Sequence, residues 1–181
     1  MKGLSRFIFN QILGWRLIGE FPDLKKYIII VVPHTSWHDF YIGVLVRSMV
    51  GIPMNFVGKK ELFNSPFGWY FRWMGGEGVD RSKNSNTVDA VVDIFEKREE
   101  FRLALAPEGT RKKVSSWKTG FYYIAKGAGV PIIMAAFDYG RKEVRLSEPF
   151  YPTADSDKDI RYLYAWFKGV EGKVKANSFE S

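Results

Sequence analysis

Both histidines of this 181-residue chain lie in one heptapeptide, Pro-His-Thr-Ser-Trp-His-Asp, at residues 33–39. Imidazole changes its charge near neutral pH, so His34 and His38 are the natural candidates for a general base. The chain contains no cysteine, which excludes thiol nucleophiles, disulfides and cysteine-type zinc sites. If His34 lies in a turn and Asp39 in the first turn of a helix, the carboxylate can reach the imidazole and fix its tautomer. Ser36 is placed to cap such a helix.

Three other roles compete for this stretch. Asp39 can simply complete a helix cap that Ser36 begins, with His34 packed at a strand end. His34 and His38 have the i, i+4 spacing of a metal-binding pair, but a glutamate within the motif and a clear third ligand are missing. Ser36 lacks the Gly-x-Ser-x-Gly elbow of a serine nucleophile. The residues therefore leave the cap and the base–carboxylate pair open, and they argue against a metal site and a nucleophilic serine.

Two further polar turns suit a phosphate. Residues 75–83 combine three glycines with Arg81 and Lys83, so that both backbone and cations can approach an anionic ligand, although a glycine-rich turn with charges is usually just a turn. Residues 107–113 read Pro-Glu-Gly-Thr-Arg-Lys-Lys and follow an apolar, strand-like run. A solvated basic loop would explain the lysines of this second turn, but not a Glu-Gly-Thr-Arg directly after a buried strand.

Strand and helix patterns alternate around these turns. The sequence predicts a single α/β domain whose sheet is mainly parallel, with some mixed pairing, and is flanked by helices. Functional groups in such sheets gather beyond the carboxyl ends of the strands, so we expect the three turns to converge. Strands are predicted at 26–33, 53–58, 101–106, 130–138 and 143–147, and helices at 3–19, 37–50, 60–74, 117–128 and 157–170, with one more capped by Asn86.

The chain is predicted to have three parts: a helix within residues 1–22, a domain over 23–171 and a tail over 172–181. The helix is apolar nearly all round, and its only charges are Lys2, Arg6 and Arg16. That pattern is typical of an anchor in a membrane interface. A helix held between the core and a partner chain would show the same pattern, so both interpretations stay open.

The composition is that of a globular protein, with 46% hydrophobic residues, 17% aromatic residues and a net charge of +7. The positive charge predicts an anionic partner. No apolar run reaches the roughly 20 residues of a spanning helix, and no signal peptide is evident. The aromatic residues of segment 62–74 do not alternate with cations as a base-stacking surface would, which argues against nucleic acid. These features predict a cytoplasmic protein that can lie on a membrane.

Four segments follow one another along the chain: His34-x4-Asp39, Val79-Asp80-Arg81, Pro107-Glu108-Gly109-Thr110-Arg111 and Gly129-Val130-Pro131-Ile132-Ile133. In this order they resemble the four motifs of the glycerolipid acyltransferase family, which includes 1-acylglycerol-3-phosphate and other lysophospholipid acyltransferases. The resemblance spans about residues 28–137. The chain departs from the usual motifs at three positions, with Pro33 where asparagine is common, Ala106 where phenylalanine is usual and Met134 where a second proline often follows. These departures leave the identity of the acceptor open.

The resemblance implies transfer of a fatty acyl group from an acyl-CoA or acyl-carrier-protein thioester to a hydroxyl of a lysolipid acceptor, by default 1-acylglycerol-3-phosphate. It assigns the general base to His34 and its orientation to Asp39, and it gives Pro131 a part in shaping a pocket. It implies no cofactor, no metal and no covalent acyl-enzyme. The residues that it assigns to the acceptor and its phosphate are Arg81, Glu108, Gly109, Thr110 and Arg111.

Together with the basic charge, the resemblance implies a peripheral protein on the cytoplasmic face of the cell membrane, without a nucleic-acid partner. Two alternatives remain. A thioesterase-like hydrolase would use the same His34–Asp39 pair on water. A lipid- or nucleic-acid-binding module would have no catalysis at all.

Overall fold

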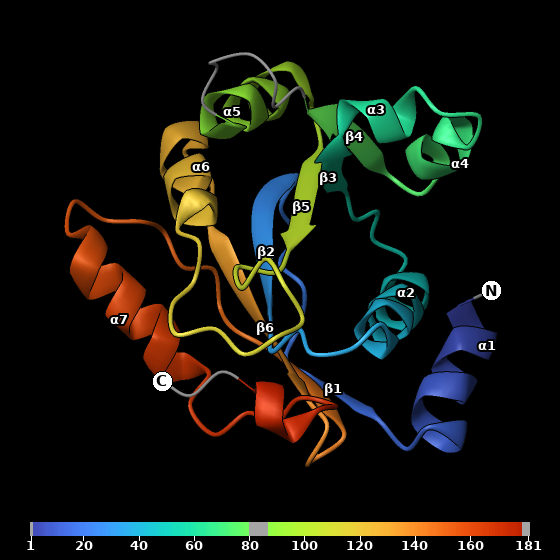
Figure 1. Ribbon diagram of the computed structural model, residues 1–181. Helices are drawn as coiled ribbons and strands as arrows, with labels where there is room; N and C mark the ends of the chain where they lie inside the picture. The colour runs from blue at the N-terminus through green and yellow to red at the C-terminus, as the bar shows by residue number, and fades with distance from the viewer. Residues whose placement is uncertain (1, 80–86, 179–181) are drawn as a thin grey trace.

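A five-stranded sheet with strand order β1-β7-β6-β2-β5 forms the centre of the molecule, shown by a computed structural model that describes residues 2–79 and 87–178 (Figure 1). Strand β2 (Lys26–Val32) pairs in parallel with β5 (Phe101–Leu105) and β6 (Ile132–Asp138). Strand β7 (Glu143–Leu146) pairs antiparallel with β6, and the short β1 (Arg16–Ile18) pairs in parallel with β7. The predicted mainly parallel, mixed sheet is confirmed.

Helices cover both faces of this sheet, and the alternation of side chains along β2 explains why. Ile28 and Ile30 point to one face, while Tyr27 and Ile29 point to the other, and all four are buried. The first face packs against α5, α6 and α7, and the second against α2 and the N-terminal segment (Figure 1). These helices are α2 (His38–Val50), α5 (Thr87–Lys97), α6 (Gly120–Ala128) and α7 (Ser156–Trp166).

The N-terminal segment is not the single helix predicted for residues 3–19. It consists of α1 (Lys2–Phe7), a π-helical turn η1 (Ile8–Ile12) and then strand β1. Gly14, at φ 69°, adopts the left-handed conformation that glycine allows and so turns the chain out of the helix. The apolar residues of this segment lie on two sides: Phe9 and Trp15 are buried in the core, whereas Leu4, Phe7 and Ile12 are exposed. This explains why the sequence pattern is apolar nearly all round.

Residues 56–79 form a small lobe beside the sheet (Figure 1). The predicted helix over 60–74 is interrupted, because Pro66 has no N–H to offer the carbonyl of Leu62, which instead accepts from the Ser65 hydroxyl at 2.7 Å. The predicted turn at 75–79 contains a strand, and a Cβ at Gly76 would lie 2.6 Å from the Phe63 ring that covers it. The lobe comprises α3 (Lys60–Phe63) and α4 (Gly68–Trp73), with parallel strands β3 (Phe56–Lys59) and β4 (Gly76–Val79).

The remaining predicted elements are present with shifted ends. The antiparallel partner expected at 143–147 is β7, helix α6 begins three residues later than predicted, and α7 ends at Trp166. The cap at Asn86 lies outside the described residues. Among residues 2–79 and 87–178, no helix has both the length and the apolar composition needed to cross a membrane.

The N-terminal segment should contribute measurably to stability. Phe9 is 0% exposed and Phe7 is 55% exposed, although both belong to the same short helical segment. We expect Phe9→Ala to lower the free energy of unfolding by about 3–5 kcal/mol, because the substitution leaves a cavity. Phe7→Ala is the matched control and should change stability by about 0.5 kcal/mol or less. Urea denaturation measures both, and equal effects would contradict the core position of Phe9.

Candidate active site

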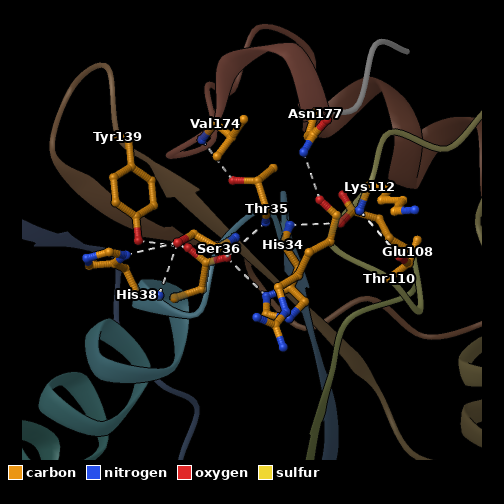
Figure 2. Close-up of polar contacts among 12 residues, drawn as sticks. His34, Thr35, Ser36, His38, Glu108, Thr110, Lys112, Tyr139, Val174 and Asn177 are labelled. Atoms are coloured by element: carbon orange, nitrogen blue, oxygen red, sulfur yellow. Dashed lines mark hydrogen bonds and ion pairs between the residues drawn. The ribbon is translucent and has the colours of Figure 1, made fainter.

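The candidate site lies where β2 and β5 end at the same edge of the sheet. The two strands are parallel neighbours, with Ile30 paired to Leu105, so their loops leave side by side. The backbone N–H of His34 donates to Oε2 of Glu108 at 2.8 Å (Figure 2). Two of the three turns predicted to converge therefore do meet. The third turn, with Arg81, lies outside the described residues except for residues 75–79.

Asp39 is the centre of this site, and its carboxylate is only 4% exposed. Its Oδ2 lies 3.0 Å from Nδ1 of His34. The same oxygen accepts the backbone N–H groups of Thr35 and Ser36, each at 2.9 Å. Its Oδ1 accepts the hydroxyl of Tyr139 at 2.7 Å. Each oxygen of the buried carboxylate therefore has a donor, as a buried charge requires.

These contacts determine the charge of Asp39. Burial alone would favour the neutral acid, but the hydrogen bonds from His34, Ser36 and Tyr139 outweigh it and lower the pKa of Asp39 below its ordinary value. An ionised carboxylate facing Nδ1 favours the tautomer in which Nδ1 carries the proton. Nε2 of His34 is then left with a lone pair, and the His34 side chain is 30% exposed. Such an imidazole can accept a proton from a bound hydroxyl.

The start of α2 combines two roles that the sequence left open. The helix begins at His38, whose N–H donates to Oγ of Ser36 at 3.3 Å, so the capping position is one residue later than predicted. Asp39 accepts the N–H of Ser36 as a capping carboxylate would, and it contacts His34 as well. His38 has a different partner, since its Nδ1 lies 2.9 Å from Oγ of Ser36. The two histidines therefore have separate contacts.

Tyr139 is the residue of the site that the sequence analysis missed. It directly follows β6, the other parallel neighbour of β2, and its ring packs edge-on against Trp15 at 4.8 Å between centroids. Burial, together with the hydrogen bond donated to Asp39, raises the pKa of the Tyr139 phenol, so it stays a donor. A signal for it did exist: a polar side chain at the carboxyl end of a predicted parallel strand, which is where such sites form.

Glu108 is buried beside the dyad, at 4% exposure. One carboxyl oxygen accepts the His34 N–H, and the other, Oε1, has no hydrogen-bond partner within the described part of the chain. Burial raises the pKa of Glu108 to about 7, because the single backbone hydrogen bond from His34 offsets only part of the cost of burying the charge. A buried oxygen without a partner can accept a hydrogen bond from a bound ligand.

The other predicted site residues fall into three groups. Gly109, Thr110 and Arg111 continue the loop after Glu108, and all three are exposed at the same edge as His34. Arg81 lies outside the described residues. Pro131 lies at the opposite edge of the sheet, where its carbonyl accepts the N–H of Ile28 at the amino end of β2. Its part in shaping a pocket stays a prediction.

Residues 172–178, predicted to be a tail, lie against both site loops (Figure 2). The N–H of Val174 donates to Oγ1 of Thr35 at 3.2 Å, and Nδ2 of Asn177 donates to the carbonyl of Arg111 at 3.1 Å. Gly172 packs so closely that a Cβ would lie 2.6 Å from Thr35. This segment, which includes the short helix η2 (Lys175–Asn177), therefore connects the loop of the dyad to the loop of Glu108.

An apolar cavity of about 300 Å³ opens beside the dyad, between α2 and the sheet. His34 and Asp39 line it together with side chains from β2, β5, β6 and β7. The aromatic segment 62–74 contributes Met74, whereas Trp69, Tyr70 and Trp73 are exposed on the lobe. The cavity can accept a hydrocarbon chain and bring the group attached to it to Nε2 of His34.

Fold and site together define a class of protein: an α/β protein in which an imidazole, hydrogen-bonded to a buried carboxylate, lines an apolar cavity. A sequence profile of the family described as Acyltransferase matches residues 18–138. The match covers more than half of the chain, so the chain belongs to the acyltransferase family. The resemblance found in the four motifs is confirmed.

Several characterised proteins are similar to this chain. The 1-acyl-sn-glycerol-3-phosphate acyltransferase of Salmonella typhimurium is 32% identical over 126 residues, which cover 66% of this chain and 50% of that protein. The Streptococcus pneumoniae enzyme of the same name is 31% identical over 143 residues, covering 76% and 52%. The chain thus spans about half the length of the curated relatives that it matches.

A solved structure shares the fold. The crystal structure of the 1-acyl-sn-glycerophosphate acyltransferase PlsC from Thermotoga maritima superposes with a TM-score of 0.62 at 20% identity. The superposition covers 92% of this chain and 74% of that one. At this identity the likeness supports the α/β fold and not the activity.

The raised pKa of Glu108 has a consequence for stability. Below about 4.5, its ordinary pKa, the carboxyl is protonated in both folded and unfolded chains; as pH rises through about 7, burial of the ionised form destabilises the folded state. The free energy of unfolding of Glu108→Gln, relative to the unsubstituted chain, should therefore increase between about pH 5 and about pH 8. Urea denaturation at both pH values measures this difference. The exposed Glu96→Gln is the control, and a pH-independent difference for Glu108→Gln would contradict the assignment.

Proposed function

We propose that this protein is an acyltransferase that moves a fatty acyl group from an acyl-CoA or acyl-carrier-protein thioester to a hydroxyl of a lysolipid, by default 1-acylglycerol-3-phosphate. One observation carries the proposal: the His34–Asp39 pair, within the segment that matches the family, lines an apolar cavity. The pair supplies a base for a hydroxyl, and the cavity supplies room for an acyl chain. The names of the relatives support the choice of acceptor.

In the proposed mechanism, Nε2 of His34 removes the proton of the acceptor hydroxyl as its oxygen attacks the thioester carbonyl. Asp39 holds Nδ1 and stabilises the imidazolium that forms. The carbon–sulfur bond then breaks, and the imidazolium returns its proton to the leaving thiolate. The acyl group passes directly between the two substrates, without an acyl-enzyme.

The loop after β5 is proposed to hold the acceptor. The Oε1 atom of Glu108 is buried and can accept a hydrogen bond from a glycerol hydroxyl. Thr110 and Arg111 follow at the exposed edge, where a guanidinium can bind a phosphate through two parallel hydrogen bonds. Arg81, the cation of the second motif, is proposed to bind the same phosphate.

We also propose that the protein works at a membrane surface, on the cytoplasmic face. Large apolar side chains are exposed on three neighbouring elements, although a soluble protein would normally cover many of them. The net charge of +7 favours a surface rich in anionic lipid. The exposed side chains are Leu4, Phe7 and Ile12 in the N-terminal segment, Trp37, Phe40 and Tyr41 at the start of α2, and Phe67, Trp69, Tyr70 and Trp73 in the lobe.

A panel of substrates tests the proposal. The protein is incubated with lysolipids and with acyl-CoA or acyl-carrier-protein donors, and mass spectrometry identifies the products. We expect an acylated lysolipid, with thiol release that depends on the acceptor. Equal thiol release without any lysolipid would favour the thioesterase-like hydrolase instead. Binding of lipid or nucleic acid with no turnover of any donor would favour the non-catalytic module.

Removal of the proposed base should abolish most of the activity. We expect His34→Ala to lower kcat by about 10³-fold, the usual contribution of a general base, with the fold retained. His38→Ala is the matched control, since His38 contacts Ser36 and not Asp39, and its effect should be mild. Steady-state kinetics with circular dichroism of both variants measures this. A loss smaller than about tenfold for His34→Ala would rule out the proposed role.

Tyr139→Phe tests the support of the dyad. The substitution removes one hydrogen bond to a charged group, so we expect kcat to fall about tenfold with little change in KM. That hydrogen bond stabilises the ionised form of Asp39, so its loss makes the His34–Asp39 pair take up a proton more readily and should move the acidic limb of the kcat–pH profile to higher pH. Tyr162→Phe, exposed on α7, is the control. A lower kcat with an unchanged pH profile would indicate that the substitution disturbs packing and that the Tyr139 hydroxyl does not position Asp39.

A further inference from the structure

A second and larger cavity, of about 650 Å³, borders His38 and Tyr139 and is lined by neither His34 nor Asp39. It is enclosed by the residues before β1, the start of α2, the turn after β6 and the segment over 171–175. Tyr139 forms part of its wall, with the hydroxyl of the same side chain on Asp39. The mechanism proposed above makes no use of this cavity.

The cavity has an excess of positive charge. Lys142, Lys173 and Lys175 line it, against the single carboxylate of Glu171. Lys175 pairs with Glu171 at 2.7 Å. Among the residues that the structure describes, two ammonium groups of this wall have no carboxylate partner: Lys142, whose Nζ donates to the carbonyl of Leu13, and Lys173, whose Nζ lies 5.8 Å from the centre of the Tyr139 ring. Two ammonium groups at one cavity suit an anion such as a phosphate.

The rim of this cavity is apolar and aromatic. Trp37 and Tyr41 line it, pack edge-on at 4.9 Å and are each more than half exposed. Leu13 extends the lining towards η1, where Ile12 is exposed. Exposed lysines beside exposed aromatic side chains match an amphipathic anion, since the lysines can bind its charged group while its hydrocarbon lies on the aromatic side chains.

We propose that this cavity binds the phosphate of an anionic phospholipid that does not react, and so holds the active site against an anionic membrane. The occupant is not the acceptor, because His34 lines the apolar cavity and is not among the residues that line this one. The proposal uses the membrane location put forward above, but it does not require acyl transfer. Among the residues it names, only Tyr139 also contacts the dyad.

A soluble, non-reacting lipid tests the proposal directly. Dihexanoyl phosphatidate carries the phosphate, but both glycerol hydroxyls are already acylated, so it cannot accept an acyl group. Titration of the full chain, followed by calorimetry and by backbone amide NMR shifts, should place the lipid at Lys142, Gly172 and Lys173. Inorganic phosphate is the second probe and should bind more weakly, because it has no hydrocarbon to lie on the rim.

Variants of matched charge then locate the site. The double variant Lys142→Gln/Lys173→Gln should bind the phosphatidate about 30-fold more weakly, from the usual contribution of two basic residues near an anionic lipid. Lys97→Gln/Lys168→Gln removes two exposed lysines elsewhere and should bind like the unsubstituted chain. Phosphatidate is also the product of the proposed reaction and can occupy the acceptor site, so Arg111→Gln, which removes a proposed acceptor contact, should leave unchanged only the affinity read from the amide shifts of Lys142, Gly172 and Lys173.

Several results would overturn the proposal. An equal loss of phosphatidate affinity in both double lysine variants would indicate general charge attraction. A loss of affinity in Arg111→Gln alone would place the phosphate in the acceptor site. Equal affinity for inorganic phosphate and phosphatidate would assign the cavity to free phosphate. Amide shifts confined to residues outside the cavity would exclude it even if a variant failed to fold. Acyl transfer is assayed separately on the unsubstituted chain, so its absence with phosphatidate binding intact would refute only the proposed function.

Discussion

The site depends on one buried charge. A carboxylate removed from water costs several kcal/mol unless donors replace the lost hydration. Asp39 receives donors from the turn after β2, from the His34 ring and from Tyr139 after β6. The same carboxylate therefore holds the start of α2 and the ring of His34, the proposed base. Any displacement of β6 relative to β2 would leave Asp39 short of a donor, which makes the packing of the sheet a condition for the chemistry.

The sheet meets this condition through its strand order. β2 lies between β5 and β6, and all three run in parallel, so the residues after each strand emerge at one edge. Glu108 and Tyr139, 74 and 100 residues from His34 and Asp39 along the chain, thus become their direct partners. Both faces of β2 are buried, which leaves its carboxyl end as the natural place for polar groups.

The sequence could predict those features that depend on residues close together along the chain, and it could not predict those that depend on pairing between distant strands. The run of branched residues in β2 and the spacing of His34 and Asp39 are local, and both were recognised. Tyr139 was missed because its role depends on pairing between β6 and β2, which no local pattern reveals. The prediction of one helix over residues 3–19 was wrong although the local pattern is helical. Gly14 turns the chain out of the helix, and the buried Trp15 leads into the edge strand β1. Strand β4 was read as a turn because glycines, which leave room for Phe63, suggest a turn.

The contacts of residues 172–178 have a consequence for the order of synthesis. A ribosome produces the His34 loop early and the Glu108 loop later, and both precede the segment that connects them through Thr35 and Arg111. Strands β2, β5 and β6 can already pair while this segment is still being made. The site of a nascent chain therefore stays incomplete until residues 172–178 make these contacts. A newly made chain can thus bury its core before Val174 holds the His34 loop through Thr35.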